Sequence, residues 1–242
     1  MITELVTNGC SYMQTYVEGN GHADLANRLN LKATDISISG SANSRIIRTT
    51  LKHSYETDNK CLYVLGMTFI SREELPICRY DPGIYPTVHD IWEGAWTNPQ
   101  NQHFGKNRWK DWTDNDTKHW VLFREKYESG TIVDRIENLM YQMLAMIDSL
   151  TSRGHNCIIY QQADKWWDGI MPDDYDRVQL LEHENIICNF KWCAVREQHL
   201  TGTPYVPGEE HIEAEMRHRM SGEHGWLNDY LETYIRKHEL HL

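Results

Sequence analysis

The sequence contains no apolar run that reaches the ~18 residues of a membrane-spanning helix, so we expect no membrane segment. Its first residues, MITELVTNG, have neither the basic nor the apolar stretch of a signal peptide. Basic residues are the minority: 24 Lys and Arg stand against 35 Asp and Glu, a formal net charge of −11. The basic residues are also scattered singly, which is not typical of a nucleic-acid-binding face. We therefore expect neither a nucleic-acid nor a membrane partner.

Cofactor motifs are missing as well. The six cysteines form no CxxC pair, and no histidine follows Cys188 and Cys193 at zinc-finger spacing. The intervals of seven and six residues between His211, His218 and His224 do not match a helical pair of metal ligands. No phosphate-binding glycine motif occurs either, so we expect no metal and no cofactor. The G-x-S-x-G nucleophile elbow is also absent. Reduced cysteines in apolar runs are typical of the cytoplasm, the expected location.

Short apolar segments alternate with helical patterns along most of the chain. We expect strands at Glu4–Thr7, Asp35–Ser39, Lys60–Met67, Asn156–Gln161 and Glu184–Asn189. We expect helices around His22–Leu29, from Asn43 or Ser44 to Tyr55, over Ile132–Arg153 and over Glu223–Lys237. Strands that alternate with helices predict a parallel sheet with helices on both sides. The fold class is therefore α/β: one domain over residues 1–242, a three-layer α/β/α sandwich around a mostly parallel sheet.

The stretch from Glu73 to Ser129 breaks this alternation. It contains four prolines and five tryptophans, with many Asn and Asp residues. A loop-rich insertion of this length in a compact domain is typical of a lid or a binding surface. A small aromatic subcore explains the same composition equally well.

Polar residues and glycines follow three of the predicted strands. Ser11 lies in the turn after the first strand, Gly40 and Asn43 follow the second, and Thr68 follows the third. Ligand sites of open α/β sheets lie at the carboxyl ends of the strands. A serine there can act as a nucleophile, and free N–H groups at a helix start can bind an oxyanion. A plain turn-capping role for Ser11 is the alternative.

A second group of candidate residues precedes the last helix. Glu215 stands three residues before His218, a spacing that lets one turn present both side chains. With Ser11 they make a possible triad in the order nucleophile, acid, base, in which the carboxylate orients the imidazole. The alternative for His218, which lies in a polar run, is an exposed surface histidine.

Four blocks of the sequence together resemble the SGNH (GDSL-like) hydrolases. The blocks are Gly9-Cys10-Ser11, Gly40, Gly66-Met67-Thr68 and Glu215-x-x-His218, with His224 six residues further on. Their order and intervals resemble that family across nearly the whole chain. The segments NGCS and SANSRIIR resemble the divergent SGNH-like proteins of tailed bacteriophages. The resemblance implies an SGNH/flavodoxin-like fold and, if the protein is phage-encoded, a location in the host cytoplasm.

The resemblance also implies roles for single residues in a serine esterase. Ser11 attacks the acyl carbon, His218 takes the proton and Glu215 orients His218. The backbone N–H groups of Gly40 and Ser11, together with Thr68, bind the oxyanion. The implied substrate is an ester of a carbohydrate or small metabolite, such as an O-acetyl ester.

Two other positions have open roles. Arg72 can add positive charge to the oxyanion site or form a surface ion pair with its acidic neighbours. Asn43 can touch substrate or cap its helix.

Two of three departures from the family pattern leave other functions open. Thr68 replaces an Asn whose amide donates to the oxyanion, and Glu215 replaces an Asp and is one methylene longer, whereas Cys10 replaces an Asp whose side chain is mostly structural. Loss of one oxyanion donor typically costs ~10²–10³ in rate. A catalytically inactive SGNH-fold binding or structural phage protein is therefore the alternative, and a metal-dependent phosphoesterase on the same sheet is a third.

Overall fold

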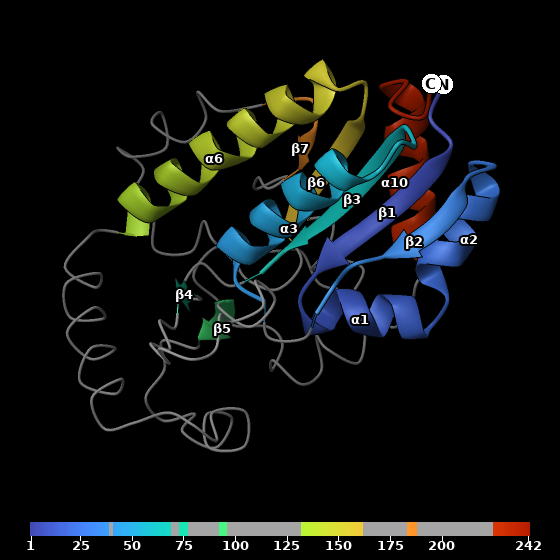
Figure 1. Cartoon of the computed structure of the whole chain (residues 1–242). Coiled ribbons are helices and arrows are strands. Elements are labelled where there is room, and N and C mark those ends of the chain that lie inside the picture. The colour runs from blue at the N-terminus through green and yellow to red at the C-terminus, as the bar shows by residue number, and fades with distance from the viewer. Residues whose placement is uncertain (39–40, 69–72, 77–91, 96–131, 162–182, 188–224) are drawn as a thin grey trace, which may run out of the picture.

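A computed structural model describes residues 1–38, 41–68, 73–76, 92–95, 132–161, 183–187 and 225–242 (Figure 1). Its central sheet has five parallel strands in the order β2-β1-β3-β6-β7. They are β1 (Glu4–Gly9), β2 (Lys32–Asp35), β3 (Cys61–Met67), β6 (Asn156–Gln161) and β7 (Ile186–Ile187). The predicted α/β fold with a parallel sheet is confirmed. Within these ranges, no helix is long and apolar enough to cross a membrane.

In the described part of the chain, five helices pack on the sheet in two groups. They are α1 (Ser11–Glu18), α2 (Gly21–Arg28), α3 (Asn43–Glu56), α6 (Ile132–Ser152) and α10 (Gly225–Lys237). Side chains of α3 and α6 form one apolar cluster with alternate strand residues such as Tyr63 and Leu65. Side chains of α1, α2 and α10 form a second cluster with Leu62 and Val64, on the other side of the strands (Figure 1). Because both faces of β3 are buried, its sequence is a continuous apolar run.

The strand order places a topological switch point beside β1. From β1 the chain first adds β2 on one side, then crosses to add β3 on the other side. Open α/β sheets bind ligands at the carboxyl ends of the strands where the order reverses in this way. The ends of β1 and β3 are level, because Gly9 pairs with Gly66.

The second strand begins earlier than predicted. It covers Lys32–Asp35 and not Asp35–Ser39, although the N–H groups of Ile36 and Ile38 still donate to the carbonyls of Thr7 and Gly9. The polar residues of β2 pair with β1 because the Glu4 carboxylate accepts from the Thr34 hydroxyl and lies 3.4 Å from Lys32 Nζ. The strand ends at Asp35, whose Oδ1 accepts from the Ser37 N–H at 3.1 Å.

Other elements also differ from the prediction. Helix α1 starts two residues after β1, where we expected only a turn. Strands β4 (Glu73–Pro76) and β5 (Trp92–Ala95) form an antiparallel pair, and the rest of the predicted insertion at 73–129 lies outside the described residues. Within the described residues, β7 covers Ile186–Ile187 and begins two residues later than the expected Glu184; residues 188–189 of the predicted strand lie outside the described part of the chain. Neither Asn43 nor Ser44 caps α3: the N-cap residue is Ala42, with no side-chain cap bond.

Candidate active site at the carboxyl ends of the first and third strands

Ser11 and Thr68 occupy equivalent places on neighbouring strands. Strand β1 ends at Gly9 and Ser11 is the first residue of α1, whereas β3 ends at Met67 and Thr68 follows. Each residue therefore lies two positions beyond the pair formed by Gly9 and Gly66. The switch point of the sheet thus brings together the first and third of the blocks identified in the sequence.

Gly9 lets α1 approach the end of the strand closely. A Cβ at this position would lie 2.6 Å from the Cβ of Met13 and 3.0 Å from the carbonyl oxygen of Gly66. Met13 is fully buried over the end of β1. Any side chain at residue 9 would push α1, and Ser11 with it, away from the sheet.

Asn8 fastens the end of β1 to α3. Its Nδ2 donates to the carbonyl of Ile46 at 3.0 Å and to the hydroxyls of Thr49 and Thr50, both at 2.9 Å. Its Oδ1 accepts from the N–H of Gly9 at 2.9 Å. A buried amide satisfied in this way positions α3 relative to β1.

Asn43 holds Thr68 by two hydrogen bonds. The N–H of Thr68 donates to Asn43 Oδ1 at 2.8 Å, and Asn43 Nδ2 donates to the carbonyl of Thr68 at 3.2 Å. Both residues are buried, with 4% of Asn43 and 0% of Thr68 exposed. The side chain of Asn43, which we expected either to cap its helix or to touch substrate, is therefore bonded to the backbone that follows β3.

Hydrogen bonds hold the chain after β2 both before and after residues 39–40. The N–H of Ser41 and its hydroxyl both donate to the carbonyl of Ile38, at 3.2 and 2.6 Å. Arg45, in the first turn of α3, donates from Nη1 to the Ser41 hydroxyl at 3.0 Å. Before residue 39, Asp35 Oδ1 accepts from the hydroxyls of Thr7 at 2.8 Å and Ser37 at 2.6 Å. Helix α3 is thus bonded to Asn8 near the end of β1, to the chain after β2 and to the chain after β3.

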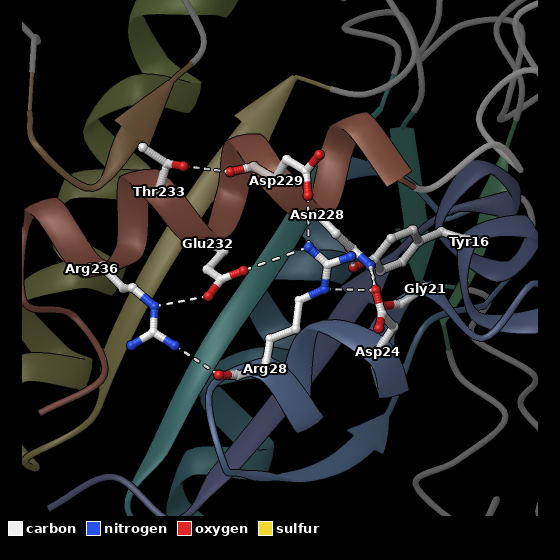
Figure 2. A network of polar contacts seen from close by, with 9 residues as sticks. All are labelled: Tyr16, Gly21, Asp24, Arg28, Asn228, Asp229, Glu232, Thr233 and Arg236. Carbon is white, nitrogen blue, oxygen red and sulfur yellow. Dashed lines mark hydrogen bonds and ion pairs between the residues drawn. The ribbon is translucent and has the colours of Figure 1, made fainter.

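A buried polar network joins α10 to α1 and α2 (Figure 2). Asn228 Oδ1 accepts from the hydroxyl of Tyr16 at 2.6 Å. Its Nδ2 donates to the carbonyl of Gly21 at 3.1 Å and to the Asp24 carboxylate at 2.8 Å. Tyr16 and Asn228 are 0% and 1% exposed, so these bonds are shielded from water. They fix the first turn of α10, ten residues after His218, against the helix that begins at Ser11.

Ion pairs extend this network towards solvent (Figure 2). Arg28 lies 2.9 Å from the Asp24 carboxylate and 2.7 Å from that of Asp229. Arg236 lies 2.9 Å from Glu232 and donates to the carbonyl of Arg28 at 2.7 Å. The bond to Asp229, followed by the neighbouring carboxylates, raises the pKa of Arg28. Exposed ion pairs of this kind each contribute little to stability, so the buried amide of Asn228 is the main polar link between α10 and the first two helices.

Two buried tyrosines near the same strand ends remain neutral. Burial raises the pKa of Tyr16 well above its ordinary value. Burial, with smaller effects from Tyr16 and Cys10, does the same for the pKa of Tyr160, which pairs with Gly66 at the end of β6. These phenols therefore place no negative charge near the strand ends.

Of the predicted site residues, the structure brings Ser11, Asn43 and Thr68 to one edge of the sheet. Gly40, Arg72, Glu215 and His218 lie outside the described residues. No group of three or more metal-ligating side chains occurs in the part of the chain that is described.

Sequence reasoning missed the roles of Asn8, Ser41, Arg45 and Asn228. Asn8 lies beyond the predicted strand Glu4–Thr7 but inside the buried strand β1, where its amide needs partners.

Comparison with known proteins adds no family. No family model matches the chain, and no curated protein is significantly similar to it.

Proposed function

We propose that the protein is a serine esterase of the SGNH type, with Ser11 as the nucleophile. The observation that carries this proposal is the position of Ser11, which begins α1 directly beyond β1 at the switch point of a parallel sheet. Thr68 follows the adjacent strand at the same level, and Asn43 holds its backbone. A nucleophile and an oxyanion donor are expected side by side at such a point.

The proposed reaction has two steps. The Ser11 hydroxyl attacks the acyl carbon and passes its proton to His218, which Glu215 orients. The backbone N–H groups of Ser11 and Gly40, with the hydroxyl of Thr68, bind the oxyanion that forms. His218 returns the proton to the leaving alcohol, and water then hydrolyses the acyl-serine by the reverse proton transfers. Arg72 adds positive charge near the oxyanion.

The finer features of the fold belong to the same proposal. We infer a three-layer α/β/α sandwich of the SGNH type, in which residues 73–129 form an insertion that shapes the substrate site. The aromatic residues of that insertion suit a sugar ring, so the substrate class is an acyl ester, such as an O-acetyl ester, of a carbohydrate or small metabolite. No metal or other cofactor takes part, and the phage-type sequence segments favour the cytoplasm of a bacterial host.

Hydrolysis of p-nitrophenyl acetate tests the proposal. We expect turnover by the intact chain, resistance to EDTA, and loss of nearly all turnover in Ser11→Ala. The control is Ser152→Ala at the end of α6, where the exposed hydroxyl only donates to the carbonyl of Ser149 at 2.9 Å. That variant keeps full activity.

Two results would count against the proposal in different ways. Turnover that EDTA abolishes would instead show a metal-dependent hydrolase, and hydrolysis of p-nitrophenyl phosphate would then test for a phosphoesterase. No turnover by the folded chain would favour an SGNH-fold binding protein.

A further inference from the structure

We propose that Asn43 is a positioning residue that aims the hydroxyl of Thr68 at the oxyanion. This inference rests on the proposed esterase function and adds a residue to it. Thr68 stands where the SGNH-like pattern has an asparagine, and its hydroxyl is shorter than an asparagine amide. A shorter donor is useful only if its backbone is held at a fixed place and angle, because oxyanion donors act through preorganised geometry.

The two bonds from Asn43 supply such a restraint. One planar amide accepts from the N–H of Thr68 at 2.8 Å and donates to its carbonyl at 3.2 Å. A residue in a hydrogen-bonded strand pair exchanges the same two bonds with its neighbour. The Asn43 side chain therefore acts as a one-residue strand partner for Thr68, beyond the last residue of β3. Two bonds to one residue restrain its rotation as well as its distance, and so set the direction of its Cα–Cβ bond.

Asn43 is itself anchored to the nucleophile side of the site. It is the first residue of α3, which Asn8 bonds to the end of β1. Ser41 and Arg45, on either side of Asn43, bond to the chain after β2. The position of Thr68 is therefore tied through α3 to the strand that leads to Ser11.

The variant Asn43→Asp replaces the Nδ2 donor of Asn43 with a second carboxylate oxygen. An ionised aspartate still accepts from the N–H of Thr68, but it cannot donate to the Thr68 carbonyl and places two acceptors together. We expect kcat to fall by about 10²-fold with little change in KM, the cost of a small displacement of a catalytic group. A protonated aspartic acid regains the missing donor, so the activity relative to the unsubstituted chain should rise as the pH is lowered.

Asn185→Asp is the matched control. Asn185 is also a buried asparagine, 6% exposed, and its Nδ2 donates to a backbone carbonyl, that of Cys157 at 2.6 Å. It precedes β7 and bonds to the second residue of β6, at the opposite end of the strands from Thr68. We expect a comparable loss of Tm and no loss of kcat.

Thr68→Val separates positioning from general damage. It removes the hydroxyl and keeps both backbone bonds to Asn43, so we expect a fall in kcat similar to that of Asn43→Asp. If Asn43 acts through this hydroxyl, the double variant loses no more kcat than Thr68→Val alone.

Each outcome decides the inference. Full kcat in Thr68→Val overturns it even if Asn43→Asp does not fold, and additive losses in the double variant overturn it when both single variants fold. If the unsubstituted chain shows no Ser11-dependent turnover, the proposed function fails and this inference fails with it. If that turnover is present and Asn43→Asp keeps full kcat, only this inference fails.

Discussion

Replacement of Gly9 by alanine should damage both the fold and the proposed site. The new Cβ would lie 2.6 Å from Met13 Cβ, so α1 must move by about 0.8 Å to reach the ordinary contact of 3.4 Å. Met13 Cβ is fixed to its helix and cannot rotate away, and the carbonyl of Gly66, at 3.0 Å, belongs to the paired strand β3. Overpacking typically costs 1–3 kcal/mol, and two rigid neighbours place this case at about 3 kcal/mol.

Thermal and urea unfolding measure this cost. For a chain of this size, about 3 kcal/mol corresponds to a Tm lower by roughly 6–12 °C. Because α1 begins at Ser11, we also expect turnover to fall more than the residual folded fraction explains. Gly225→Ala, at the first residue of α10, is the control, since a Cβ there meets nothing within 4 Å. Equal Tm values for Gly9→Ala and Gly225→Ala would refute the close approach of α1 to β1.

Three further predictions concern buried polar groups. Tyr16→Phe leaves Asn228 Oδ1 without its donor and should lower the free energy of unfolding by about 1–3 kcal/mol, and an unchanged urea midpoint would contradict this. Burial, followed by nearby positive charges, lowers the pKa of His155 below 6.5, so the fold holds the neutral ring while the unfolded chain takes up a proton. The free energy of unfolding should therefore fall as the pH drops below about 6.5, and it should fall less steeply in His155→Gln. Equal pH dependence of the free energy of unfolding in the two proteins would contradict this prediction. Burial raises the pKa of Cys61 to about 11 and that of Cys157 to about 12, so iodoacetamide should modify both only after unfolding, as peptide mapping can check.

Apolar patterning was sufficient to predict most of the sheet and its main helices. The strand Asn156–Gln161 and the start of α6 at Ile132 agree with the structure, because burial on one or both faces leaves a strong apolar period. Strand β2 was misplaced because side-chain bonds to Glu4 pair its polar residues, whereas the apolar alternation lies after its end. Helix α1 was missed because it begins only two residues beyond a strand.

The candidate site was predictable in position and less so in construction. The strand pattern put Ser11 and Thr68 after the first and third strands, at carboxyl ends that a parallel sheet aligns, and the structure shows that these two strands are neighbours. The pairing of Asn43 with Thr68, 25 residues apart, depends on how α3 packs and leaves no periodic signal. The bond between Tyr16 and Asn228, 212 residues apart, is a contact of the same long-range kind.

The most direct test of the proposed nucleophile is labelling with a fluorophosphonate probe at neutral pH, followed by peptide mapping, on the intact chain and on His218→Ala. We expect one adduct on Ser11 in the intact chain, because the probe reacts with an activated serine, and none in His218→Ala, where the base is missing. Absence of an adduct on the folded protein, or equal labelling of Ser11 in both proteins, would contradict a serine activated by His218.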